Sequence, residues 1–213
     1  MVLKRALSAL FVVTIAAGTL AAQHSSPKVA KTNHTGPNTA SIQPGSRRLL
    51  WSNLGPSPTN AYNSATGYYV LGPNNSVGLP EQWIGVPFVP KVNATVTALQ
   101  VAVQWISGTN TFSVGLYSDN GGTVGTLLAG GTGSNAPAFG TCCLTVNVNI
   151  PSTSISQGSQ YWIVASSDDV NAPDFTGVYV ASNLDVIAGD VGQGGWSSFT
   201  TNTPAAAAWG TIP

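Results

Sequence analysis

The sequence contains very little charge. Only 7% of its 213 residues are Asp, Glu, Lys or Arg, whereas soluble domains commonly carry about a quarter. Apart from Lys91, every basic residue precedes position 49, and all the acids follow it. A domain with a single lysine cannot neutralise a run of phosphates, which argues against nucleic acid as a partner. Polarity comes instead from Ser, Thr, Asn and Gln, a composition typical of extracellular β-proteins.

Histidine is absent beyond position 34. Both histidines, His24 and His34, lie near the N-terminus, so the rest of the chain can form no Ser-His-Asp triad, Cys-His pair or His-ligated metal site. Glycine-rich phosphate-binding and dinucleotide-binding motifs are also missing. Two carboxylates are enough for glycoside hydrolysis, so a cryptic glycosidase that uses Glu81 and an aspartate stays open. We expect no enzyme activity and no cofactor.

The chain has only two cysteines, Cys142 and Cys143, and they are adjacent. Neighbouring Cα atoms lie ~3.8 Å apart, below the usual disulfide range of ~4.4–6.8 Å, so a bond between them requires a distorted turn. Three alternatives remain: a strained vicinal disulfide in an oxidising compartment, two unpaired thiols, or bridges between molecules. Without a histidine beside them, a zinc site is not expected.

Long hydrophobic runs are limited to the N-terminus. Residues 1–22 combine a basic start, a short apolar core and small residues for cleavage, which predicts an export signal rather than a membrane span. Residues 23–48 are polar, hold three prolines and show no periodicity, which predicts a disordered linker. Residues 49–213 then form one domain. The protein should be secreted or displayed at the cell surface, and should not span a membrane once the signal is removed.

Residues 111–130 contain the clearest hairpin pattern in the chain. Apolar positions alternate with mixed ones, and the Asn-Gly and Gly-Gly pairs at 119–122 suit a tight turn. We place this hairpin at the centre of the fold. Its apolar face consists of Phe112, Val114 and Leu116, and its mixed face of Ser113, Gly115 and Tyr117.

Short strands separated by Gly, Pro and Asn turns fill the rest of the domain, and no stretch has apolar residues at helical spacing. This pattern predicts an all-β fold, a single antiparallel β-sandwich of jelly-roll-like form. A turn is predicted at 151–157. The other predicted strands are residues 49–51, 67–71, 81–89, 95–106, 144–150, 160–166, 177–182, 196–200 and 205–211.

Several motifs together resemble the choice-of-anchor domains of exported bacterial proteins. They are LLWSNLGP, QWISGTNTFSVGLYSDNGG, GTLLAGG, FGTCCLTV, ISQGSQYWIVAS and AAAAWGTI, and they cover nearly all of residues 49–213. The resemblance implies a β-sandwich in a secreted or surface protein, but it supplies no activity. The final residues, 210–213, depart from the anchored pattern because they hold no apolar tail or basic cluster.

Exposed aromatic side chains are the best candidates for ligand binding, because sugars stack on flat rings beside amide and carboxylate groups. Trp83, Tyr179 and Trp196 are such candidates, with Asp168 and Asp169 as polar partners. Core packing is the competing interpretation for each ring. The same two aspartates, and Asp119, offer oxygen ligands for a structural calcium ion, although Asp in such loops more often stabilises the turn itself.

These observations predict a secreted, non-enzymatic β-sandwich that serves as a structural or adhesive component of the cell surface or extracellular matrix. Its expected partners are extracellular polysaccharides or other surface components. A carbohydrate-binding module is the first alternative, and a cryptic glycoside hydrolase is the second.

Overall fold

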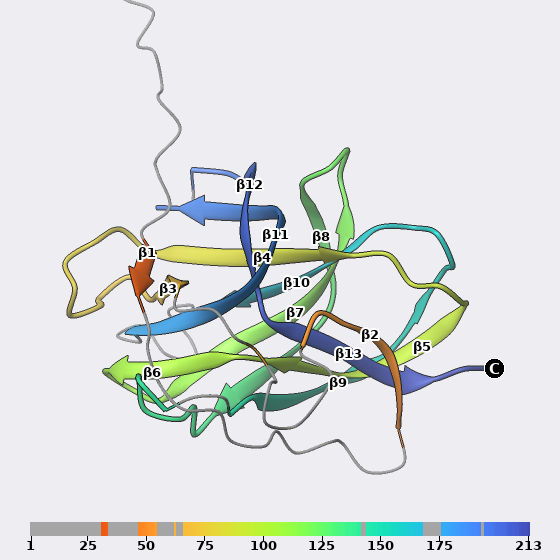
Figure 1. Cartoon of the computed structure of the whole chain (residues 1–213), viewed down its shortest axis with the longest axis horizontal. Helices are drawn as coiled ribbons and strands as arrows, with labels where there is room; N and C mark the ends of the chain where they lie inside the picture. Colours follow the sequence, from red (N-terminus) through yellow and green to blue (C-terminus); the bar gives the residue numbers. More distant parts are fainter. Residues whose placement is uncertain are drawn as a thin grey trace, which may run out of the picture.

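The computed structural model describes residues 31–33, 47–54, 62, 66–141, 144–167, 176–192 and 194–213. In these ranges the chain is all-β: antiparallel strands form two sheets that pack face to face as a β-sandwich (Figure 1). The predicted fold class is confirmed. The described part of the chain also holds no helix with the length and apolar character needed to cross a membrane.

The larger sheet follows the order β1-β3-β11-β4-β10-β7-β8, and β6 and β12 pair with β11 beside this path. The smaller sheet follows the order β2-β13-β5-β9. The strands of the larger sheet are β1 (Lys31–Asn33), β3 (Thr66–Leu71), β4 (Gln82–Phe88), β6 (Val103–Ser107), β7 (Thr111–Asp119), β8 (Val124–Ser134), β10 (Tyr161–Ser166), β11 (Thr176–Val191) and β12 (Ser197–Pro204). Those of the smaller sheet are β2 (Arg48–Ser52), β5 (Ala94–Val101), β9 (Val146–Ile155) and β13 (Ala206–Thr211).

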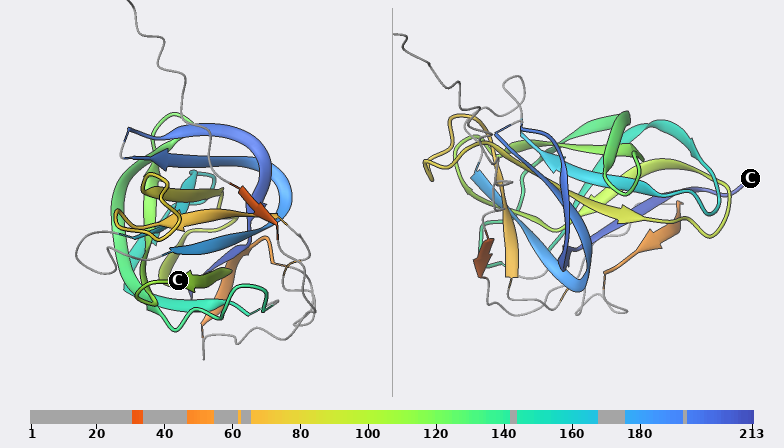
Figure 2. Two further views of the ribbon diagram at one scale, coloured as in Figure 1. Left: turned by 90° about the vertical axis from the view of Figure 1, so that its left-hand side faces the viewer. Right: turned by 90° about the horizontal axis from the view of Figure 1, so that it is seen from above.

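Alternation along the strands places one face of each sheet in a shared core (Figure 2). On β7, the predicted apolar positions Phe112, Val114 and Leu116 are all buried. The neighbouring strands of the larger sheet add Ile84, Val86 and Ile163, and the smaller sheet adds Val96, Leu99, Val101 and Val148. The period of two in the sequence therefore identifies the core-facing residues correctly.

The β7–β8 hairpin forms where the sequence predicts it. The Asn120 amide donates to the Thr123 carbonyl at 2.9 Å, and Gly121 and Gly122 have φ angles of 65° and 89°, which other residues rarely adopt. Its position differs from the prediction, because β8 is the edge strand of the larger sheet and not its centre. Sequence alternation identifies a hairpin, but it does not reveal how many strands pair beyond it.

Residues 95–106 do not form the single strand predicted from their alternation. The run is divided at Ala102, where the chain leaves β5 in the smaller sheet and enters β6 in the larger one. The C-terminal segment makes the same passage at Ala205, between β12 and β13. The Ala102 amide donates to the Ala205 carbonyl at 3.0 Å, and both residues are fully buried. Small side chains at these two points let the two passages lie side by side, and Tyr62 packs over them.

Several strands continue past their predicted ends, including β8, which runs to Ser134, and β12, which runs to Pro204. β9 continues through Pro151 to Ile155, so the turn predicted at 151–157 begins too early. Pro151 is accommodated because β9 is an edge strand and its pairing with β5 shifts register there. β11 runs to Val191, well past the predicted end at residue 182. Strand β1, paired with β3, lies inside the segment 23–48 that we predicted to be a linker.

Candidate ligand groove

The outer face of the larger sheet, turned away from the smaller sheet, carries a groove across strands β10, β7 and β8. Three cross-strand rows of residues create it. The middle row aligns Val164, Gly115 and Gly130, which are register partners on these strands. Because two of the three have no side chain, the surface is low along this row. The mixed face that the sequence indicates on β7 therefore becomes the floor of a depression.

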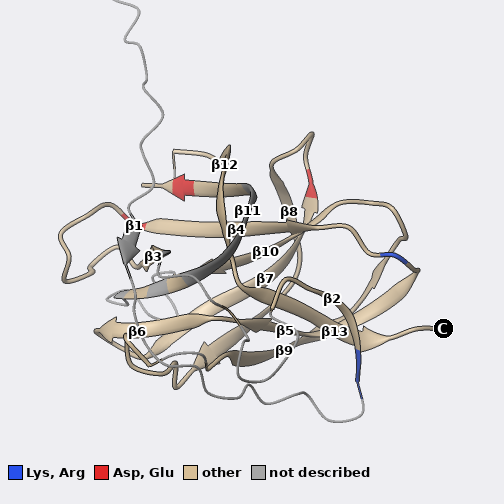
Figure 3. Cartoon of the chain, in the orientation of Figure 1, with Lys and Arg blue, Asp and Glu red and all other residues tan. Residues whose placement is uncertain are grey.

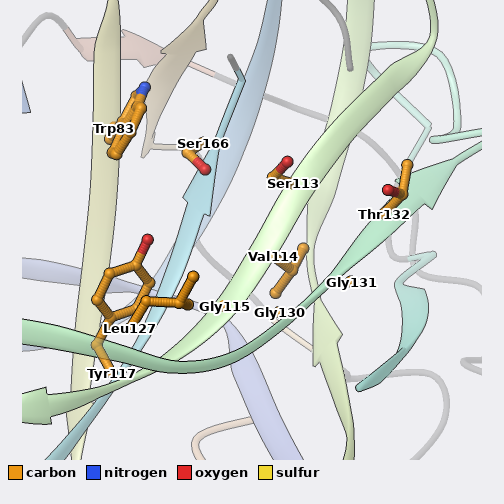
Figure 4. Close-up of a pocket in the computed structure, with 10 residues that line it drawn as sticks. All are labelled: Trp83, Ser113, Val114, Gly115, Tyr117, Leu127, Gly130, Gly131, Thr132 and Ser166. Carbon is orange, nitrogen blue, oxygen red and sulfur yellow. The ribbon is translucent and has the colours of Figure 1, made fainter. Parts of the chain in front are cut away.

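The two flanking rows form the walls of the groove. On one side Tyr117 is paired with Leu127, and on the other Ser113 lies between Ser166 and Thr132. Tryptophan from β4 completes the lining, and the cavity has a volume of about 430 Å³ (Figure 4). The lining residues are Trp83, Ser113, Val114, Gly115, Tyr117, Leu127, Gly130, Gly131, Thr132 and Ser166.

The indole of Trp83 is held in a fixed orientation. Its Nε1 donates to Glu81 Oε1 at 2.8 Å and to the Ser167 carbonyl at 3.1 Å. The ring is only partly buried, and Figure 4 shows it beside Ser166, at the end of the row that holds Ser113 and Thr132. An aromatic ring that is anchored through its nitrogen keeps its face in place, so a ligand does not have to immobilise it on binding.

The turn of the β7–β8 hairpin folds over the outer face and limits the groove. The Val124 side chain covers Gly85 on β4, where an added Cβ would lie 3.0 Å from it. Ser198 Oγ, from β12, donates to the Gly122 carbonyl at 2.8 Å. Val124 and its neighbours form a second apolar cluster on this face, made of Val124, Trp162, Val164 and Ala188 with Trp83, Tyr117 and Trp196 packed against it.

Asp119 fastens this turn to the sheet. Its Oδ1 accepts from Gln160 Nε2 at 2.6 Å and from Trp162 Nε1 at 2.8 Å, while Oδ2 accepts from the Gly122 amide at 3.0 Å. Burial acts to raise the pKa of Asp119, but the hydrogen bonds from Gly122, Trp162, Gln160 and Gly121 together outweigh it, so the pKa lies below its ordinary value. The carboxylate oxygens considered for calcium are thus engaged by N–H donors.

Charged residues are distributed unevenly along the described chain (Figure 3). Asp119 lies two residues beyond Tyr117 on β7, Glu81 bonds Trp83, and Asp190 on β11 is the register partner of Trp83. No lysine or arginine is among the lining residues. Of the described basic residues, Lys31 lies on β1 at the opposite edge of the larger sheet from β8, Arg47 and Arg48 lie at β2, and Lys91 lies between β4 and β5.

The structure brings only one of the predicted ligand-binding residues into the groove, namely Trp83. Trp196 is partly buried in the outer-face cluster beside it but does not line the cavity. Tyr179 is fully buried in the core between the sheets, so its ring presents no face to solvent. Asp168, Asp169, Cys142 and Cys143 lie outside the described residues.

Sequence reasoning missed most of the groove. Ser113, Gly115 and Tyr117 were identified as the mixed face of a hairpin, but they were not assigned to a site. The signal was the glycine, since Gly115 interrupts an otherwise regular strand at a position facing away from the core. Thr132 and Ser166 could not be added without knowing that β8 and β10 flank β7.

Within the described ranges, no group of three or more His, Cys, Asp or Glu side chains is arranged to hold a metal ion. No protein-family model matches the chain, and no curated protein matches its sequence.

Proposed function

We propose that this protein is an exported, non-enzymatic β-sandwich that acts as an adhesive or structural component outside the cell, and that it holds extracellular polysaccharide in the outer-face groove. The observation that carries the proposal is the groove itself, where Trp83 and Tyr117 lie near a row of hydroxyl side chains. The C–H groups of a sugar ring suit the negative face of an aromatic ring. Its hydroxyls suit Ser and Thr, which both donate and accept hydrogen bonds.

The chemistry of the lining favours holding a ligand over transforming it. Apart from the phenol of Tyr117, the ten lining residues carry only hydroxyl, indole, aliphatic or backbone groups. Glu81 contacts the lining, but its Oε1 accepts the Trp83 indole N–H. Hydrolysis of a glycoside requires two carboxyl groups on either side of the scissile bond, so these groups favour a binding role.

The N-terminal export signal and the resemblance to choice-of-anchor domains support a location outside the cell. The low content of charged residues also supports a location outside the cell. The strands carry hydroxyl side chains instead, and these are compatible with a hydrated polysaccharide matrix. Tethering of such a matrix to cells would be an adhesive role for which binding alone is sufficient.

Affinity electrophoresis tests the proposal. The full chain, lacking only its export signal, should migrate more slowly through native gels that contain a bound polysaccharide than through gels without polymer. The polymer should be recovered without new reducing ends. A chain that no polysaccharide retards would contradict the proposal. Release of reducing sugars that Glu81→Gln abolishes would replace it with the glycosidase alternative.

A further inference from the structure

We infer that the groove selects uncharged polysaccharide and rejects polymers that carry carboxylate or sulfate groups. The inference rests on the proposed function and specifies the ligand of the same site. It follows from the placement of charge around the lining residues, and not from the shape of the groove alone.

Recognition of an acidic sugar generally uses Arg or Lys, which pair with carboxylate and sulfate groups. The lining contains neither residue. The described basic residues, Lys31, Arg47, Arg48 and Lys91, belong to β1 at the opposite edge of the larger sheet from β8, to the β2 end of the smaller sheet and to the β4–β5 connection. Arg47 donates from Nη1 to Asn149 Oδ1 at 2.9 Å on β9, so its side chain is directed toward the smaller sheet.

Negative charge instead lies beside two of the lining residues, Trp83 and Tyr117. Glu81 contacts the Trp83 indole, Asp190 is the register partner of Trp83, and Asp119 lies on the same strand as Tyr117. The hydrogen bonds to Asp119 favour its ionised form. Carboxylates beside the lining repel a polyanion, and salt screens this repulsion beyond a distance of about 8 Å at physiological ionic strength. An uncharged sugar meets no such repulsion and needs only the rings and hydroxyl groups.

The glycine floor allows the groove to be blocked without disturbing the fold. An added Cβ at Gly130 would lie 3.5 Å from the Val114 carbonyl and 3.7 Å from Leu127 Cδ1, both ordinary contacts. Gly130 is exposed and faces the groove, so Gly130→Phe places a ring inside the cavity. Ser154→Phe is the matched control, because Ser154 is also exposed in a strand but lies on β9 of the smaller sheet.

The experiment compares each uncharged polymer with its own carboxylated derivative in affinity electrophoresis, for example dextran with carboxymethyl dextran and hydroxyethyl cellulose with carboxymethyl cellulose. We expect the neutral member of a bound pair to have an affinity about tenfold higher, since like charges oppose the carboxylated member. Gly130→Phe should remove the retardation, and Ser154→Phe should leave it unchanged. Thr132→Lys should raise the affinity for the carboxylated polymer.

The outcomes separate the two proposals. Retardation by the carboxylated polymer that equals or exceeds that by its neutral parent overturns the charge selectivity and leaves polysaccharide binding intact. Retardation that persists in Gly130→Phe moves binding away from the groove and overturns the inference. Failure of every polymer, neutral or charged, overturns the proposed function as well. Equal urea unfolding midpoints for Gly130→Phe and the native chain ensure that loss of binding reflects the blocked groove.

Discussion

The two sheets meet in different ways at two places. At the first, here called the crossing, the chain itself passes from one sheet to the other at Ala102 and Ala205, whose backbones share a hydrogen bond. At the second, the edge contact, β8 lies against β9 without pairing, and Gly131 approaches Asn149 so closely that an added Cβ would lie 2.2 Å from the Asn149 carbonyl oxygen. The crossing depends on continuity of the chain, whereas the edge contact depends on a missing side chain.

The polar groups near these two places also differ. Beside the crossing, Gln104 Nε2 donates to Tyr62 Oη at 3.0 Å and to the Thr141 carbonyl at 2.9 Å, and its Oε1 accepts from the Gly140 amide at 3.1 Å. The hairpin that contains β8 is instead fastened by the ionised carboxylate of Asp119. A neutral network is insensitive to acid, while a carboxylate is not. One fold can therefore combine a neutral hydrogen-bond network, which acid does not weaken, with an ionised carboxylate, which acid does weaken.

The edge contact should be broken most severely by Gly131→Val. The new side chain must displace the backbone of β9, so we expect a loss of about 3 kcal/mol in the free energy of unfolding. Gly130→Val is the matched control, because its Cβ meets nothing closer than 3.5 Å. Urea unfolding at neutral pH measures both variants. Equal losses would contradict the close approach of β8 to β9.

The crossing should be weakened by Gln104→Leu, which preserves volume but removes the amide. The buried hydroxyl of Tyr62 would lose a hydrogen bond and the Gly140–Thr141 turn would lose its anchor, at a cost of about 2 kcal/mol. Gln157→Leu, at an exposed position, should change little. The measurement is again urea unfolding. A loss that varies strongly between pH 4 and pH 8 would contradict a neutral network.

At alkaline pH, the crossing should become the weaker of the two places. Burial raises the pKa of Tyr62 to about 12, against a smaller opposing effect of the Gln104 hydrogen bond. A raised pKa means that the stabilisation is complete below pH 10 and is lost as pH rises toward 12. Tyr62→Phe should therefore reduce the alkaline loss of unfolding free energy by about 1.5 kcal/mol. Tyr68→Phe should reduce the alkaline loss as well, since burial also raises the pKa of Tyr68, which hydrogen-bonds Thr201 away from the crossing. An alkaline loss that Tyr62→Phe leaves unchanged would contradict the role of the buried Tyr62 phenol.

Acid should weaken the hairpin and spare the crossing. The pKa of Asp119 is lowered on folding, so its stabilisation is complete above the unfolded value of about 3.9 and disappears as pH falls through the folded value. Because the carboxylate is near solvent, the effect should be small, about 1 kcal/mol. The free energy of unfolding of the native chain should exceed that of Asp119→Asn at pH 6, and the difference should vanish near the acid limit. A constant difference would assign another role to Asp119.

Local sequence patterns were sufficient to find most of the strands and the hairpin turn, but not where several strands begin and end. Phe112, Val114 and Leu116 are identified by alternation, and the turn by its glycines, because these signals act over a few neighbouring residues. The passage at Ala102 was missed since alternation continues through it: Leu99, Val101 and Val103 all face the core even though the chain changes sheets. Alternation records which way a side chain points and does not record which strand lies beside it.

The groove could not be predicted from the sequence for the same reason. Its floor requires Gly115 to be paired with Gly130 and its walls require Ser166 beside Ser113, and both pairings depend on the order and register of strands that are distant in sequence. Trp83 is a candidate because its flat aromatic ring could stack on a sugar, which is a property of the residue type alone. Tyr179 was selected on the same grounds, but it occupies the core because β11 presents it to the inner face.

The position of β13 has a consequence for the timing of folding. This strand, at residues 206–211, lies between β2 and β5, so the smaller sheet has a gap in its interior until that stretch of chain arrives. Contacts between such distant segments form late and slowly. A polypeptide of this design remains without its complete sandwich while its earlier residues emerge from the ribosome, and the two sheets can enclose their shared core fully only after residues 206–211 are available to pair with β2 and β5.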